Sequence, residues 1–291
     1  MKLGVITDGI SRDLAHALSV MDEYGLEEAE LQFIGEKEVG DLDGSERSAA
    51  LELIRRHEKS VSCISRHLFA GMPMGTSKPG DDLHQKHMDA LKRCIEMAHE
   101  FDCPLVRIMT GKKEMILWGR NGAEKWNVAH GAWEAQLPLI APAVELARAE
   151  GVRLVVETGN GTMVNSCYTG RKLIDDLDAK DALQVLWDPA NNCWCGERAF
   201  PDGYEEVRDG YLGHIHIKDV HADAPRATLE VRPMLKGQLA DQFRPMAAAL
   251  REDGYKGSIS FESVYHPGNG DYEAGFRQNI EIFKEIFGPS N

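Results

Sequence analysis

Long apolar stretches are missing from this sequence of 291 residues. No apolar run approaches the roughly 20 residues that a helix needs to cross a bilayer. The N-terminal segment also lacks the apolar core and the small-residue cleavage site of a secretory signal. These absences predict a cytoplasmic protein with no membrane partner.

Cysteine is scarce as well. Six cysteines are few for a chain of this length, and Cys193-Trp194-Cys195 lacks the two-residue spacing of a CxxC zinc or redox motif. We therefore expect reduced thiols. The closeness of Cys193 and Cys195 to Asp188 leaves a redox or metal role for these two as the alternative.

Basic residues are outnumbered, with 33 Lys and Arg against 47 Asp and Glu and a formal net charge of −14. A negative surface field repels phosphate backbones, which argues against nucleic acid as a partner. The 43% hydrophobic content is enough for a large core. No internal repeat, linker or low-complexity tract marks a boundary. We expect a single domain over residues 1–291.

Short apolar, β-branched runs alternate with longer segments of helical periodicity, which is typical of parallel strands joined by crossover helices. The expected strands are Leu3–Thr7, Glu30–Ile34, Val61–Ser65, Leu105–Met109, Arg153–Glu157, Gln184–Trp187, His214–Ile217 and Ser258–Phe261. The expected helices are Arg12–Tyr24, Glu46–Lys59, Leu83–Phe101, Ala132–Glu150, Arg171–Leu177, Tyr204–Arg208, Gln242–Glu252 and Tyr272–Phe287. Eight such pairs predict an α/β fold, the (β/α)8 TIM barrel.

Two connections after expected strands are unusually long, Gly71–Asp82 and Gly111–Ala129. Loops at the carboxyl ends of barrel strands commonly form lids and substrate walls. The second carries Trp118 among other aromatic and cationic residues, which suits a lid over a polyhydroxylated or anionic ligand. A partly solvated loop anchored by its tryptophans is the alternative.

Four residues that could bind a metal stand at the ends of the last four expected strands, Glu157, Asp188, His216 and Glu262. A single carboxylate there often only caps the next helix, and a lone histidine is often a satisfied core residue. Three carboxylates in one barrel mouth, however, would repel one another at high cost without a cation. The pattern predicts a divalent metal site.

Carboxylate and imidazole donors suit Mn²⁺, Mg²⁺, Co²⁺ or Zn²⁺, and we expect Mn²⁺. The two-residue period of a strand places His214, His216 and Lys218 on one face. Position nearer the carboxyl end favours His216 as the ligand. Lys218 is expected either to reach a substrate oxygen or to form a structural ion pair.

The segments VVETGN, LWDPANN, GHIHIKD and GYKGSISFES resemble the xylose isomerase-like TIM barrel superfamily of sugar isomerases, epimerases and dehydratases. The resemblance covers nearly the whole chain, including ITDGISRDLAHAL and VRIMTG. It implies that Glu157, Asp188, His216 and Glu262 are metal ligands and that the two glutamates also act as acid and base. It also makes a homodimer or homotetramer an expectation.

Further substrate contacts follow from the same resemblance. Asn191 stands where related epimerases often place a histidine, and this departure argues against a ketose epimerase. His67 lies in a region that contacts substrate in relatives, with a buried structural imidazole as the alternative. Arg107 is expected either to bind a substrate carboxylate or phosphate or to pair with interior carboxylates.

The site supports several reactions of a carbonyl compound with an acidic α-hydrogen. A sugar isomerase or epimerase that works through an enediolate, with Glu157 and Glu262 as the acid–base pair, is our first prediction. The substrate would be a small carbohydrate or sugar acid, phosphorylated or not. GHIHIKD and Asn191 keep open a lyase or dehydratase of a keto-polyol, similar to inosose dehydratases. A non-catalytic sugar-binding protein is the alternative of another class.

Overall fold

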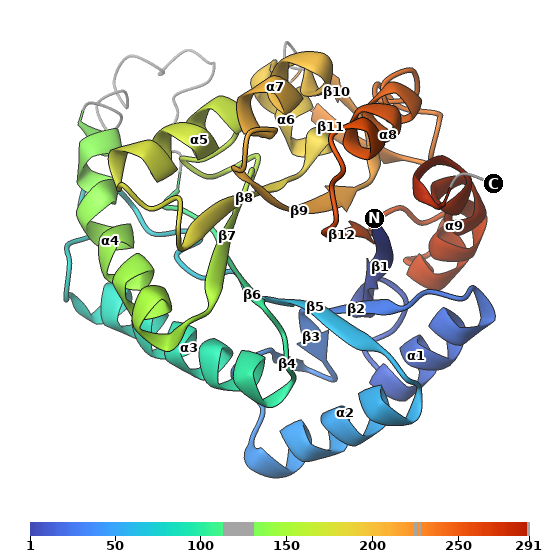
Figure 1. Ribbon diagram of the computed structural model, residues 1–291, viewed down its shortest axis with the longest axis horizontal. Coiled ribbons are helices and arrows are strands. Elements are labelled where there is room, and N and C mark those ends of the chain that lie inside the picture. Colours follow the sequence, from blue (N-terminus) through green and yellow to red (C-terminus); the bar gives the residue numbers. More distant parts are fainter. Residues whose placement is uncertain (113–130, 224–225, 227, 290–291) are drawn as a thin grey trace.

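The computed structural model describes residues 1–112, 131–223, 226 and 228–289. Its centre is a closed barrel in which neighbouring strands run parallel, in the order β1-β12-β9-β8-β7-β6-β5-β2 (Figure 1). These strands are β1 (Lys2–Ile6), β2 (Glu28–Leu31), β5 (Ser60–Ser65), β6 (Leu105–Ile108), β7 (Arg153–Glu157), β8 (Leu183–Trp187), β9 (Leu212–Ile217) and β12 (Ser258–Phe261). The predicted (β/α)8 TIM barrel is confirmed.

Helices surround the barrel as an outer ring (Figure 1). They are α1 (Leu14–Glu23), α2 (Gly44–Arg56), α3 (Asp82–Glu100), α4 (Ala132–Glu150), α5 (Cys167–Asp176), α6 (Pro189–Cys195), α7 (Tyr204–Val207), α8 (Phe243–Glu252) and α9 (Tyr272–Phe287). In α3, Met88, Leu91, Ile95 and Ala98 are buried at steps of three and four residues. This spacing places them along one apolar stripe that packs on the barrel.

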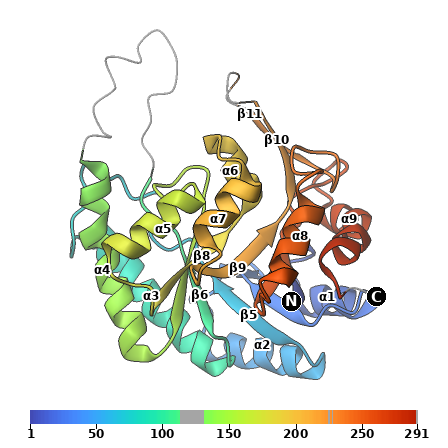
Figure 2. The same cartoon turned by 45° about the horizontal axis from the view of Figure 1, so that its top comes forward.

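The structure corrects the predicted second strand, Glu30–Ile34. The barrel strand β2 begins two residues earlier and ends at Leu31, whereas β3 (Phe33–Ile34) pairs with β4 (Lys37–Glu38) in a separate hairpin. One continuous run of β-forming residues therefore serves two sheets. A second hairpin, β10 (Asp219–Asp223) with β11 (Thr228–Arg232), follows β9 and stands out beyond the barrel (Figure 2). Neither hairpin was expected from the sequence.

The barrel interior is filled by alternate residues of each strand. A small apolar cluster of Cys63, Val155 and Leu186 is separate from the main core between barrel and helices. Val155 lies two residues before Glu157 and therefore shares its face of β7. The apolar cluster thus forms a floor, and the polar residues at the carboxyl ends of the strands lie above it.

Candidate metal centre

The structure brings together the four residues that the sequence predicts as metal ligands. Glu157 is the last residue of β7, and His216 lies near the end of β9. Asp188 follows β8, and Glu262 follows β12. One ligand atom from each of the four lies within 4.8 Å of the others. Because these residues are 28 to 105 positions apart, only the closing of the barrel makes them one cluster.

Asp188 is fixed by the start of helix α6. Its Oδ1 atom accepts hydrogen bonds from the backbone N–H groups of Ala190 and Asn191, at 3.0 and 3.1 Å. Pro189 occupies the first turn of this helix, where a missing N–H costs nothing. One carboxylate oxygen therefore caps the helix, and Oδ2 remains for the mouth of the barrel.

His216 presents one ring nitrogen to the carboxylates. Its Nδ1 atom lies 3.7 Å from both Glu157 Oε1 and Glu262 Oε2. That atom is buried and has no hydrogen-bond partner among the described residues. Burial lowers the pKa of His216, but the carboxylates of Glu30 and Glu157 outweigh it and raise this pKa to about 10. The imidazole consequently holds a proton at neutral pH until another cation replaces it.

Two basic side chains compensate the negative charge. Arg107 Nη1 donates to Glu157 Oε2 at 2.9 Å, and both side chains are almost completely buried. Burial raises the pKa of Glu157, yet Arg107, His216 and Lys218 together hold it well below its ordinary value. Lys218 Nζ contacts Asp188 Oδ2 and also lies 2.5 Å from Glu262 Oε2. Its pKa is raised by these carboxylates despite burial, so the ammonium is charged.

Asn191 joins the same cluster. Its Nδ2 atom donates to Asp188 Oδ2 at 2.7 Å and lies 3.4 Å from Glu157 Oε1. Burial raises the pKa of Asp188 to about 6, against the opposing charge of Lys218 and with the help of Glu262 and Glu157. Because the amide of Asn191 is neutral, it binds two candidate ligands, Asp188 and Glu157, without adding charge to the site.

The donor set fits a divalent metal. Metal–oxygen and metal–nitrogen bonds of about 2.0–2.2 Å place donor atoms up to roughly 4 Å apart, and the four ligand atoms here lie within 4.8 Å of one another. The unpartnered Nδ1 atom of His216 faces this space. Three carboxylates with one imidazole are suitable for Mn²⁺, Mg²⁺, Co²⁺ or Zn²⁺.

The remaining predicted residues lie elsewhere or beyond the described chain. His67 directs its Nδ1 atom and its backbone N–H to Glu38 Oε1, at 2.8 and 2.9 Å, and its side chain is half-exposed. The alternative of a buried structural imidazole is therefore wrong for this residue. Trp118 lies outside the described residues, as does most of the predicted loop Gly111–Ala129.

The sequence interpretation missed Glu30, which is fully buried and bridges the two histidines of β9. Glu28 and Glu30 alternate on one face of β2, and both are buried. Strands of a closed parallel barrel are normally apolar on both faces, so charged residues at alternate positions need partners inside it. The alternation of Glu28 and Glu30 was therefore the sequence signal for a buried polar network in the barrel.

The six cysteines all lie within the described residues, and none of them forms a disulfide. Cys193 Sγ donates to the carbonyl of Pro189 at 3.6 Å. Burial, together with the nearby charge of Asp188, raises the pKa of its thiol to about 12. Because the thiolate is the reactive and metal-binding form, this environment does not favour a redox or metal role for Cys193.

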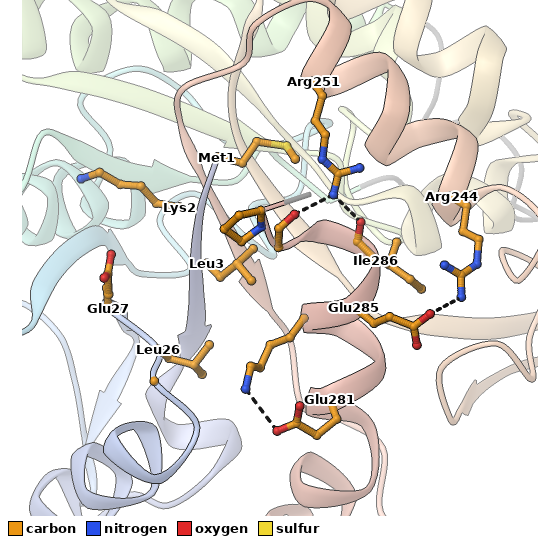
Figure 3. A pocket seen from close by; sticks show the side chains of 14 residues that line it. Met1, Lys2, Leu3, Leu26, Glu27, Arg244, Arg251, Glu281, Glu285 and Ile286 are labelled. Carbon is orange, nitrogen blue, oxygen red and sulfur yellow. Dashed lines mark hydrogen bonds and ion pairs between the residues drawn. The ribbon is translucent and has the colours of Figure 1, made fainter. Parts of the chain in front are cut away.

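A pocket of about 660 Å³ lies at the opposite end of the barrel, around Lys2 at the start of β1 (Figure 3). Its cations already have partners. Arg244 pairs with Glu285 at 2.8 Å, and Lys284 pairs with Glu281 at 3.1 Å. Arg251 donates to two carbonyls near the end of α9. Barrel enzymes carry their active sites at the carboxyl ends of the strands, where the four-ligand cluster lies.

Among the described residues, no helix is both long and apolar enough to cross a membrane.

The model of the family described as xylose isomerase-like TIM barrel matches residues 18–286 of this chain. No curated protein matches the sequence.

Solved structures share the fold at low sequence identity. A xylose isomerase-like TIM barrel protein from Mycobacterium smegmatis in complex with magnesium is 19% identical, with a TM-score of 0.66 over 94% of this chain and 88% of that one. D-psicose 3-epimerase with D-tagatose from Clostridium cellulolyticum is 14% identical, with a TM-score of 0.71 over 99% and 100%. A probable 3-DHS dehydratase from Bacillus anthracis is 16% identical, with a TM-score of 0.67 over 95% and 98%.

Proposed function

Since this chain belongs to the xylose isomerase-like TIM barrel family, we propose that it is a divalent-metal-dependent isomerase or epimerase of a small carbohydrate or sugar acid. The observation that carries the proposal is the placement of Glu157 and Glu262. Both carboxylates lie 3.7 Å from the same unpartnered atom, His216 Nδ1, at the mouth of the barrel. Two carboxylates beside one candidate metal position can act on one carbon of a bound substrate.

Glu157, Asp188, His216 and Glu262 would hold the ion, and we propose Mn²⁺. A divalent metal supplies a Lewis acid that stabilises negative charge developing on the oxygens of an enediolate. The other contributions come from the chain. Arg107 keeps Glu157 ionised, so this carboxylate is available to accept a proton at neutral pH.

The reaction follows from two acid–base groups. One glutamate removes the proton from the carbon next to the substrate carbonyl, and the electron pair of that C–H bond forms the enediolate. Its partner then returns a proton to the opposite face of the same carbon, which gives epimerisation, or to the neighbouring carbon, which gives isomerisation. No atom is gained or lost in either case.

Lys218 and Asn191 are proposed to orient substrate oxygens. Lys218 Nζ contacts Asp188 and Glu262, and Asn191 Nδ2 contacts Asp188 and Glu157. Both are hydrogen-bond donors at the level of the ligands. Holding the hydroxyl and carbonyl oxygens in place aligns the α-hydrogen with a carboxylate, which lowers the entropic part of the barrier.

Dehydration of a keto-polyol is the second candidate. It is favoured by Asn191, a neutral donor rather than a base beside Asp188, and by the structural similarity to the probable dehydratase. The same enediolate would then expel a β-hydroxyl, which leaves as water with a proton from one of the two glutamates, and the mass of the product changes.

The test is incubation of metal-stripped protein, with and without Mn²⁺, with ketoses, sugar acids and inososes in deuterated water. NMR and mass spectrometry follow the products. Deuterium next to the carbonyl, only with metal and without other mass change, is the expected result. Loss of water would establish the dehydratase instead. Tight Mn²⁺ binding without exchange across the panel would contradict both and favour a sugar-binding protein.

The affinity for Mn²⁺ is expected to rise between about pH 5 and about pH 8. His216, with a pKa of about 10, and Asp188, with a pKa of about 6, hold protons below these values. A ligand must lose its proton before it binds metal, so protons compete more strongly as the pH falls. Calorimetry in two buffers of different ionisation enthalpy counts the protons released. Binding that is independent of pH and releases no proton would contradict this expectation.

A further inference from the structure

A buried polar network lies directly beneath the candidate metal centre. Glu30 of β2 is fully buried, and its carboxylate lies between the two histidines of β9. The Oε1 atom lies 2.9 Å from His216 Nε2, and the Oε2 atom lies 2.8 Å from His214 Nε2. Ser65 Oγ donates a hydrogen bond to Oε1. Residues of two other strands, β5 and β9, therefore hold this one carboxylate of β2.

These contacts determine which nitrogen of each ring carries hydrogen. An ionised carboxylate only accepts hydrogen bonds, so Nε2 must be the donor in both His214 and His216. Two imidazole nitrogens and the Ser65 hydroxyl surround the two oxygens of Glu30, and such a set of donors suits the carboxylate form. In the neutral ring of His216, the lone pair is then on Nδ1, the atom that faces Glu157 and Glu262.

We propose that Glu30 is a positioning residue for the metal centre, which fixes the ring orientation and tautomer of His216, and that His214 and Ser65 lock the Glu30 carboxylate for this purpose. Ser65 holds one oxygen, and His214 holds the other. The carboxylate cannot rotate without losing one of these bonds. A fixed negative charge at Nε2 also makes Nδ1 a stronger donor to a metal.

The inference rests on the proposed function, because it assigns a partner to a ligand of the same site. The same network has a second conceivable role, which is to balance charge within the barrel. Glu28 serves as the control that distinguishes this role from the positioning of His216. It is buried on the same face of β2, two residues away, but its partners are Lys2, at 2.8 Å, and Ser258, at 3.3 Å, and neither is a candidate ligand.

The experiment compares Mn²⁺ affinity by calorimetry in the wild-type protein, Glu30→Gln and the matched control Glu28→Gln. Glu30→Gln keeps the size of the side chain but removes the charge. We expect about 10- to 100-fold weaker binding, the usual effect of removing a partner of a metal ligand. Glu28→Gln is expected to bind within about twofold of the wild type, because its carboxylate does not contact a ligand. Equal affinity in Glu30→Gln and the wild type would overturn the positioning role alone.

A second measurement does not depend on the stability of a variant. In wild-type protein loaded with Zn²⁺, nitrogen NMR of the histidine side chains reports which atom of His216 carries hydrogen. We expect a protonated Nε2 with a hydrogen-bonded proton. A protonated Nδ1 with Nε2 bound to metal would overturn the inference. Failure of the wild-type protein to bind any divalent metal would overturn the proposed function as well, and the two failures are therefore distinct.

Discussion

Replacing Glu262 with glutamine is expected to lower the rate of product formation by about 10²- to 10⁴-fold, the contribution usually made by one general acid or base. Glutamine keeps an oxygen that can bind metal but cannot accept a proton. In the wild type, Lys218 Nζ lies 2.5 Å from Glu262 Oε2, and the amide oxygen of glutamine would still accept a hydrogen bond from it. The measurement is kcat for conversion, followed by NMR, at saturating Mn²⁺ so that weaker metal binding does not contribute.

In Glu262→Gln, the exchange of the substrate's α-hydrogen with solvent deuterium should continue while conversion to the product stops. If Glu157 and Glu262 act on opposite faces, the epimer whose proton faces Glu157 still exchanges with solvent deuterium, but it is not converted. The reciprocal result is expected for Glu157→Gln. Glu36→Gln is the matched control, because that side chain is 90% exposed and pairs with Arg12. Full activity in both site variants would contradict the two-base mechanism.

Replacing Arg107 with methionine is expected to reduce the free energy of unfolding of the metal-free protein by about 3–5 kcal/mol. The guanidinium and the Glu157 carboxylate are 2.9 Å apart, with exposed side-chain fractions of 3% and 7%. Removing the cation leaves a buried carboxylate that has lost its nearest positive charge, so its lost hydration is less well compensated. Urea denaturation of the variant and the wild type gives the difference.

Two further variants make this result specific. Arg244→Met removes an ion pair of similar length, 2.8 Å, whose side chains are 57% and 63% exposed. We expect a change of at most about 1 kcal/mol there, because water already solvates both charges. The double variant Arg107→Met with Glu157→Gln should recover part of the lost stability, since it removes the unpaired charge. A double variant less stable than Arg107→Met would show that packing, rather than charge, causes the loss.

Added Mn²⁺ should stabilise Arg107→Met more than the wild type, because the ion offers Glu157 a cation in place of the lost guanidinium.

The sequence left two roles open for Arg107. The ion pair with Glu157 assigns it to one of them, the pair with an interior carboxylate. Its Nε and Nη2 atoms remain without hydrogen-bond partners among the described residues. A contact between these atoms and a substrate anion stays a prediction.

Much of the site could be predicted from the sequence because a barrel converts local patterns into a shared position. A carboxylate or histidine at the carboxyl end of a buried strand must reach the same mouth as the others. Glu157, Asp188, His216 and Glu262 each follow or end such a run, and the structure places them together. The choice of His216 over His214 also agrees with the geometry, because only His216 has a ring atom near Glu157 and Glu262.

The sequence by itself determined the order of the barrel strands and the identity of this cluster, because two- and 3.6-residue periods depend only on neighbouring residues. Tertiary structure alone decided how the charges of the cluster are compensated. Glu30 meets His216 across 186 positions, and Arg107 meets Glu157 across 50. Which buried cation lies opposite which carboxylate depends on strand register around the closed barrel, and no local pattern encodes that register.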